Sequence, residues 1–333
     1  MSTLYIDRQG TELRTDNGVL HIETPDGTGN RRLPIKFIDR VVMRAETHFS
    51  SRVLCALAEA GSTVLALGGR GGQQVAQLTG APHGDARRRW QQVLSLSQPD
   101  ACAALAKSFV VAKIRRQHST LVSIAQARPD LRKPLRDGQA TLDRILVSLR
   151  DPESRLSLAS IRGHEGAAAA AYFPAYFSAF APSLAATTRN RRPPTDPVNA
   201  TLSLSYTLLY SQATSACWSA GLDPALGALH TLSHARAALA CDLMEPHRPG
   251  VDIWVWQLFR SETLRPEHFG RDGAGACLLG KAGRSRFYEA WEEAARHQSR
   301  RLLRHARHLA RAFDAQIEPG TWAHLSDGAL HSD

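Results

Sequence analysis

Short apolar groups separated by turn signals occupy the first 80 residues of the chain. Asp16-Asn17-Gly18 separates two such groups and is a strong signal for a β-hairpin, and Asp26-Gly27 marks a further turn. Residues 50–60 instead follow a helical pattern that begins with serine, and residues 63–67 form the continuous apolar run of a buried strand. We therefore expect a small sheet or sandwich with one covering helix.

The apolar pattern becomes helical after a short linker and then remains helical. The fold class that this predicts is α+β, with a small β-rich N-terminal domain followed by a larger all-α domain. The expected boundaries are residues 1–82 for the β-rich domain, 83–86 for the linker, 87–317 for the α-helical domain and 318–333 for a flexible tail. The helices that we expect span residues 87–96, 101–127, 134–150, 156–173, 199–220 and 284–314.

The chain has a formal net charge of +10, and all of this excess lies beyond residue 86. Residues 1–86 contain nine basic and nine acidic side chains, so they are neutral overall. A polyanion is therefore expected to meet the second part of the chain, although a basic charge that serves only solubility is an alternative. One predicted helix there carries arginines near helical spacing, at Arg296, Arg300, Arg304, Arg307 and Arg311.

The cysteines and the apolar stretches indicate a reducing compartment and no membrane span. The chain has five cysteines, which are odd in number, widely spaced and never in a Cys-x-x-Cys pair. Its apolar stretches fall short of the ~18–20 residues that cross a bilayer. The first residues also lack the basic and then apolar pattern of a signal peptide. We expect a cytoplasmic protein without a disulfide framework or a zinc knuckle.

Four polar side chains stand in apolar or glycine-rich surroundings: Glu165, His230, Asp242 and Glu245. Carboxylates are seldom buried unless they are paired or bound to a metal, and two carboxylates three residues apart share a helix face. With a histidine and a third carboxylate they form a ligand set suited to Mg²⁺ or Mn²⁺. Taken singly, each has a simpler explanation as a solvated helix charge or, for His230, a hydrogen-bonded core histidine.

Five motifs follow one another along the chain: Gly163-His164-Glu165-Gly166, Arg189-Asn190-Arg191-Arg192, Gly221-Leu222-Asp223-Pro224, Leu229-His230 and Asp242-Leu243-Met244-Glu245-Pro246-His247-Arg248-Pro249. In their order and spacing they resemble the CRISPR adaptation integrase, the first-numbered and near-universal family among the prokaryotic CRISPR-associated proteins. The resemblance covers nearly the whole chain and implies the same order of a β-rich domain and a helical catalytic domain.

The resemblance also implies roles for individual residues. Glu165, His230 and Glu245 match the ligands of Mg²⁺ or Mn²⁺, and Asp242 matches a further catalytic acidic residue. Arg191, Arg192, Asn199 and Arg248 match positions that brace the site or contact DNA, and Lys113 and Gln117 match a Lys-Ile-x-x-Gln pattern. We also expect Lys113, Arg87, Arg88 and Arg89 to bind DNA. The chain departs from the family pattern at Arg116, Ala228, Ala235 and Ala238, none of which is a metal ligand.

The implied reaction is a transesterification in which a 3′-hydroxyl of new spacer DNA attacks a phosphodiester at the end of a CRISPR repeat. The implied partners are double-stranded DNA, a second copy of the chain in a homodimer formed through the β-rich domain, and the small ferredoxin-like second adaptation protein in a heterohexamer. A structure-specific endonuclease for branched DNA, which uses water as the nucleophile, is an alternative with the same chemistry. A non-catalytic DNA-binding scaffold is an alternative of a different class.

Overall fold

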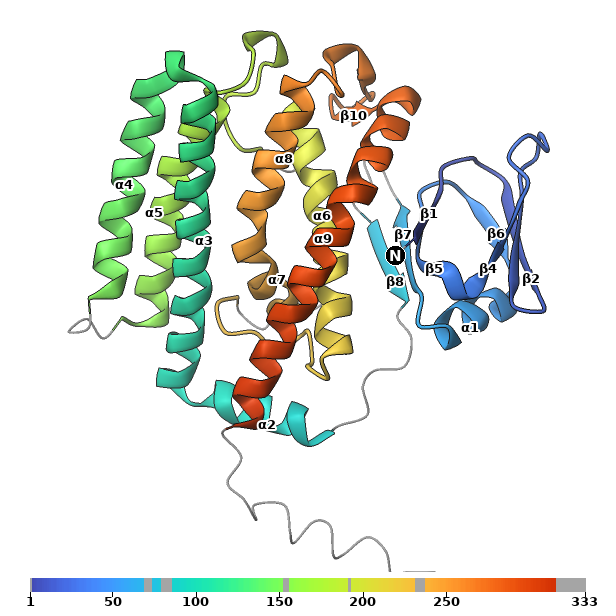
Figure 1. Cartoon of the computed structure of the whole chain (residues 1–333), viewed down its shortest axis with the longest axis horizontal. Helices are drawn as coiled ribbons and strands as arrows, with labels where there is room; N and C mark the ends of the chain where they lie inside the picture. The colour runs from blue at the N-terminus through green and yellow to red at the C-terminus, as the bar shows by residue number, and fades with distance from the viewer. Residues whose placement is uncertain are drawn as a thin grey trace, which may run out of the picture.

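The computed structural model describes residues 2–68, 74–78, 86–151, 156–190, 193–230 and 237–315. A strand-rich region is followed by a mostly helical one, as the sequence predicted (Figure 1). The last strand of the strand-rich region ends at Leu78, and the first long helix of the second region begins at Ala86. Residues 83–85 of the predicted linker and all of the predicted tail lie outside the described residues.

The strand-rich region is built from two four-stranded sheets. One has the order β1-β5-β7-β8, in which β1, β5 and β7 are parallel and β8 is antiparallel to β7. The other has the order β4-β3-β2-β6. The bounds are β1 Ser2–Ile6, β2 Thr11–Asp16, β3 Val19–Glu23, β4 Arg31–Pro34, β5 Ile38–Met43, β6 Thr47–Phe49, β7 Thr63–Gly68 and β8 Gln74–Leu78.

The predicted hairpin turn lies between β2 and β3. Asn17 and Gly18 both have positive φ angles, 48° and 74°, and Asp16 pairs with Val19 across the turn. A two-residue turn with two positive φ angles matches the twist of the flanking strands, which explains the Asn-Gly pair. Buried side chains from both sheets, among them Leu20 and Val41, form one core with helix α1 (Ser51–Glu59). The sandwich with one covering helix is therefore confirmed.

The helical region contains all of the long helices that the sequence predicted, together with some shorter elements that it did not. A two-stranded hairpin, β9 (Phe269–Arg271) with β10 (Cys277–Leu279), interrupts the otherwise helical order. The helices are α2 Ala86–Ser97, α3 Pro99–Ala127, α4 Arg132–Arg150, α5 Leu158–Phe177, α6 Pro197–Ser219, α7 Ala238–Met244, α8 Arg248–Arg260 and α9 Lys281–Asp314.

Helix α5 continues through Pro174, one residue beyond its expected end. The sequence predicted an end at residue 173, but α5 runs past Pro174 to Phe177. Tyr176 in this last turn is buried, and its hydroxyl donates to the carbonyl oxygen of Asp252 on α8 at 2.8 Å. The packing of this last turn therefore outweighs the backbone hydrogen bond that Pro174 cannot make.

Helices α6 and α9 connect the strand-rich region to the remaining helices (Figure 1). Tyr5 of β1 stacks on Tyr288 of α9 with ring centroids 4.3 Å apart. Asp7 accepts a hydrogen bond from Arg284 of α9 at 2.7 Å. Thr63 of β7 lies 3.2 Å from the hydroxyl of Ser215 on α6. The parallel sheet is thus packed onto the helical region.

Gly138 permits close packing of α4 against its neighbours. A Cβ atom at this position would lie 2.8 Å from the Cβ of Ala175 on α5 and 3.1 Å from Cδ1 of Leu121 on α3. We expect Gly138→Val to destabilise the protein by about 1–3 kcal/mol, because the new side chain overpacks this helix contact. Urea unfolding measures the effect. Gly163→Val is the control, since its Cβ would meet nothing within 4 Å, and equal losses in both variants would contradict the packing argument.

His305 of α9 lies 3.4 Å from His247, measured from Nδ1 to Nε2. Burial, with the nearby charge of Arg116, lowers the pKa of His305 to about 4. A histidine whose folded pKa is depressed stabilises the fold fully above its unfolded pKa of about 6.5, and this stability is lost as the pH falls toward the folded value.

Without the imidazole of His305, the free energy of unfolding should fall less as the pH is lowered. Between pH 7 and pH 4.5 we expect the wild type to lose about 1–3 kcal/mol more than His305→Gln. Urea unfolding of both proteins across this range measures the difference. His297→Gln, an exposed position on the same helix, should retain the wild-type dependence. Superimposable curves for wild type and His305→Gln would refute the prediction.

Candidate active site

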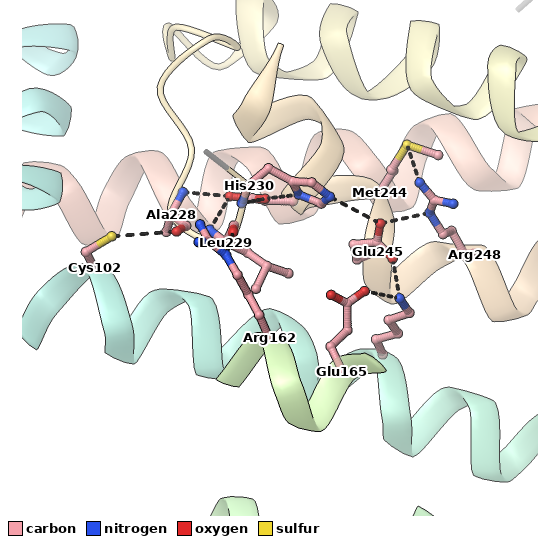
Figure 2. A network of polar contacts seen from close by, with 11 residues as sticks. Cys102, Arg162, Glu165, Ala228, Leu229, His230, Met244, Glu245 and Arg248 are labelled. Carbon is pink, nitrogen blue, oxygen red and sulfur yellow. Dashed lines mark hydrogen bonds and ion pairs between the residues drawn. The ribbon is translucent and has the colours of Figure 1, made fainter. Parts of the chain in front are cut away.

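The four polar residues singled out from the sequence lie in one network of polar contacts, and Figure 2 labels three of them, Glu165, His230 and Glu245. Glu165 lies on α5, and His230 follows α6. Asp242 lies in α7, and Glu245 begins the short 3₁₀ turn Glu245–His247 that joins α7 to α8. Lys113 reaches the same place from the middle of α3.

Asp242 is fully buried, and its carboxylate is saturated with hydrogen bonds. It accepts from the backbone N–H groups of Ala228 at 2.6 Å, Leu229 at 2.9 Å and His230 at 3.0 Å. It also lies 2.6 Å from Nδ1 of the His230 imidazole. The sequence suggested that Asp242 and Glu245 present their carboxylates on one helix face. Both carboxylates do lie beside the imidazole of His230: Asp242 is at Nδ1, and Glu245 is 3.9 Å from Nε2.

Gly227 is required by the close approach of this loop to α7. A Cβ atom there would lie 2.7 Å from Oδ2 of Asp242 and 2.6 Å from the carbonyl carbon of Ala238. From the other side, Arg162 of α5 donates to the carbonyl oxygen of Leu229 at 2.7 Å. The segment from Gly227 to His230 is therefore held by both α7 and α5.

The Asp242 contact fixes the orientation of the His230 imidazole. A carboxylate can only accept here, so Nδ1 carries the proton of this hydrogen bond and Nε2 keeps its lone pair in the neutral ring. Nε2 lies 3.9 Å from Oε1 of Glu245. A carboxylate that orients a histidine in this way is a common arrangement behind metal-binding imidazoles.

Glu245 is only 3% exposed and lies between two cations. Its Oε1 lies 3.0 Å from Nε of Arg248, and its Oε2 lies 2.7 Å from Nζ of Lys113. Burial on its own would raise the pKa of Glu245, but Arg248 and Lys113 outweigh it and lower the pKa to about 2. Glu245 is therefore ionised throughout the physiological range.

Lys113 bridges the two glutamates. Its Nζ lies 2.5 Å from Oε1 of Glu165 as well as 2.7 Å from Glu245. As the side chains lie, no three His, Cys, Asp or Glu side chains among the described residues converge closely enough to hold a metal ion. Two carboxylates and an imidazole nitrogen are nevertheless a donor set that suits Mg²⁺ or Mn²⁺.

Arg248 is anchored by a buried polar cluster that the sequence did not point to. Its guanidinium lies over the ring of Tyr206 at 4.7 Å. The Tyr206 hydroxyl donates to Asp252, which also accepts from Tyr172 at 2.9 Å. Burial raises the pKa of Asp252 to about 6, against the lowering effect of the two hydroxyl donors. No motif marked Asp252, whose only sequence signal is its place one helical turn beyond Arg248.

Asn199 braces the backbone beside the arginine-rich loop. It is completely buried, and its Nδ2 donates to the carbonyl oxygen of Thr188 at 2.8 Å and to Asp196 at 2.7 Å. Its Oδ1 accepts from Arg189 at 2.7 Å and from the backbone of Asn190 at 3.1 Å. Asn199 was expected either to brace the site or to contact DNA, and these contacts are those of a bracing residue. Arg191 and Arg192 lie outside the described residues.

The other residues predicted to bind DNA have different surroundings. Lys113 lies inside the acidic site rather than on an open surface. Arg88 makes an ion pair with Asp314 at 2.6 Å and donates to the carbonyl oxygen of Ala220 at 2.8 Å, so it joins α2 to α9 and α6. Arg87 is exposed and Arg89 is partly exposed. The guanidinium of Arg88 is thus engaged within the protein, and contact of Arg87, Arg88 and Arg89 with DNA stays a prediction.

Comparisons with known proteins identify the family. The family model described as CRISPR associated protein Cas1 matches residues 4–293. CRISPR-associated endonuclease Cas1 1 of Thermodesulfovibrio yellowstonii is 33% identical over 299 residues, which are 90% of this chain and 92% of that protein. CRISPR-associated endonuclease Cas1 2 of Rhodospirillum rubrum is 34% identical over 309 residues, covering 90% and 88%. The chain therefore belongs to the Cas1 family, as its motifs predicted.

Solved structures share the fold across nearly the whole chain. A casposase bound to its integration product has a TM-score of 0.83 at 22% identity and covers 96% of this chain and 92% of its own. A Cas1 protein from Thermotoga maritima has a TM-score of 0.82 at 20% identity, covering 96% and 99%. The Cas6-RT-Cas1–Cas2 complex has a TM-score of 0.77 at 23% identity, covering 95% of this chain and 35% of that one. Within the described ranges, no helix is long and apolar enough to cross a membrane.

Asp242→Asn tests how the histidine is held. An amide offers one acceptor oxygen where Asp242 offers two, so at least one buried N–H group loses its partner. We expect a loss of stability of about 1–3 kcal/mol and a mixture of imidazole tautomers at His230. Chemical unfolding and ¹⁵N NMR of the histidine ring measure the two effects. Asp137→Asn, on the exposed face of α4, is the control, and a single unchanged tautomer in Asp242→Asn would contradict this role.

Proposed function

We propose that this Cas1 protein is a metal-dependent DNA integrase and endonuclease that inserts new spacer DNA into a CRISPR array. The observation that carries the proposal is that Lys113 pairs with both Glu165 and Glu245, while the oriented Nε2 of His230 lies 3.9 Å from Glu245. Its relatives are named CRISPR-associated endonucleases. The basic excess of the helical region supports a nucleic acid as the substrate.

Glu165, Glu245 and His230 would hold Mg²⁺ or Mn²⁺, which would supply Lewis-acid chemistry at the scissile phosphodiester. Asp242 keeps the imidazole in the tautomer with a free Nε2, and Arg248 holds the carboxylate of Glu245 in place. In the reaction, the 3′-oxygen of the incoming strand loses its proton and forms a bond to phosphorus. The bond from phosphorus to the 3′-oxygen of the repeat strand breaks, and that oxygen takes up a proton.

DNA would be held mainly through its phosphates. The arginines of α9 are exposed at five positions near helical spacing, and Arg87 and Arg89 of α2 add further positive charge. We retain Arg191 and Arg192 as predicted phosphate contacts, since guanidinium groups bind phosphate oxygens in pairs. Contacts of this kind position the duplex without reading its sequence, so binding should weaken steeply as salt is added.

The proposed assembly is a homodimer formed through the strand-rich region, joined to the small ferredoxin-like second adaptation protein in a heterohexamer. Residues 1–86 are neutral overall, which suits a protein interface better than a DNA surface. Phe37 on this region is 62% exposed and provides apolar surface for such an interface. A structural neighbour was solved in a complex of Cas1 with Cas2.

Hydrolysis of branched DNA is the second candidate, because the same donor set would serve when water replaces the 3′-hydroxyl. This candidate is supported by the relatives, which are named endonucleases. The products separate the two reactions, because integration leaves joined strands whereas hydrolysis leaves only nicks.

The test is the joining of a short duplex with free 3′-hydroxyls to a supercoiled plasmid that carries the cognate repeat. With Mn²⁺ and the second adaptation protein present, we expect Glu165→Gln and His230→Ala to lower the rate at least about 100-fold, which corresponds to roughly 2.7 kcal/mol of transition-state stabilisation. Glu289→Gln, an exposed glutamate of α9, is the control. Tight DNA binding without joining or nicking, equal in wild type and variants, would indicate a scaffold instead.

A further inference from the structure

The ammonium group of Lys113 occupies the position between Glu165 and Glu245 where a divalent cation would be expected. Its distances of 2.5 and 2.7 Å to the two carboxylates are those of close ion pairs. We propose that Lys113 is a displaceable counter-ion, which a divalent cation replaces between the two glutamates and which then pairs with a phosphate of the bound DNA. This inference rests on the proposed function, because it concerns the metal site of the same reaction.

The burial of Lys113 argues against a role as an ordinary surface contact for DNA. The residue is 8% exposed and lies on the same side of α3 as the core residues Phe109, Val110 and Ile114. Lysine is rarely buried to this degree unless its charge is paired. Within the described part of the chain, its ammonium pairs only with Glu165 and Glu245. Its place in the site is therefore set by these two carboxylates.

Among the positively charged or polar groups around Glu245, Lys113 is the one that is able to move. Arg248 lies against the ring of Tyr206 and within 3.9 Å of the sulfur of Met244, so its guanidinium is anchored. His230 is fixed by Asp242. Lys113 ends in a flexible chain of four methylene groups, whose ammonium can turn toward a new anion while the stem stays packed.

The ammonium and a divalent cation compete for the same oxygen atoms. Oxygen ligands lie about 2.0–2.1 Å from Mg²⁺, closer than the distances at which Lys113 now pairs with them. Two carboxylates at 2.5 and 2.7 Å favour the charged form of the Lys113 side chain. Two cations within a few ångströms in a buried site repel strongly. Removing the lysine charge should therefore strengthen metal binding.

DNA should influence this competition. Glu165, Glu245, Lys113 and Arg248 together are formally neutral, so a divalent cation added while Lys113 stays in place leaves two uncompensated positive charges. A DNA phosphate offers the displaced ammonium a new partner. Metal binding and DNA binding should therefore strengthen each other in the wild-type protein, and this coupling should weaken when the lysine charge is absent.

The experiment measures Mn²⁺ affinity by electron paramagnetic resonance on the full chain without DNA. We expect Lys113→Met to bind Mn²⁺ about tenfold more tightly than the wild type, because the competing charge is gone. Lys107→Met, on the same helix, is the matched control and should leave the affinity unchanged. An unchanged affinity in Lys113→Met would overturn the proposal in favour of a plain DNA contact, and a weaker affinity would overturn it in favour of a lysine that only orders the carboxylates.

Two further variants keep the result interpretable. Lys113→Gln should shift the affinity in the same direction, and it replaces Lys113→Met if that protein does not fold. Glu165→Gln should weaken Mn²⁺ binding in the otherwise wild-type chain. If Glu165→Gln binds Mn²⁺ as the wild type does, the proposed metal site itself is wrong. If Glu165→Gln weakens binding but neither Lys113 variant tightens it, only the displacement of Lys113 is refuted.

Discussion

The buried carboxylate of Glu245 requires compensating positive charge, and the arrangement of the site depends on how that charge is supplied. Arg248, which is held against Tyr206, supplies one positive charge beside the carboxylate. Lys113, which also pairs with Glu165, supplies the other. An unpaired buried carboxylate would be costly, so helices α3, α5 and α8 converge around this residue. The proposed chemistry uses the same charge balance, with a divalent cation in place of one partner.

The second constraint is the carboxylate of Asp242, which gathers three backbone N–H groups and the His230 ring. These hydrogen bonds shape the loop that carries His230, and Gly227 allows that loop to lie against α7. Asp242 therefore acts as a positioning residue. The two acidic residues of one short motif have separate tasks, because one orients the histidine and the other faces the cation.

The sequence predicted the β-rich start and the long helices, because hydrophobic periodicity and turn residues are local signals. The four polar residues that the structure brings together were marked by their apolar surroundings and by the family motifs. It did not predict the hydrogen bonds from the backbone of Ala228, Leu229 and His230 to Asp242, because these residues lie 12 to 14 positions away along the chain. The contact between Lys113 and Glu165 spans 52 residues and has no local signal. Arg88 was assigned to DNA as part of a run of basic residues, and no local signal marked its ion pair with Asp314, 226 residues away.

The most direct test of this account is a crystal structure of the wild-type protein soaked with Mn²⁺ and measured at the manganese absorption edge. The account predicts one anomalous peak bounded by carboxylate oxygens of Glu165 and Glu245 and by Nε2 of His230, with Nζ of Lys113 withdrawn from both glutamates. A peak elsewhere, or Lys113 still bridging the two carboxylates beside the bound ion, would contradict it.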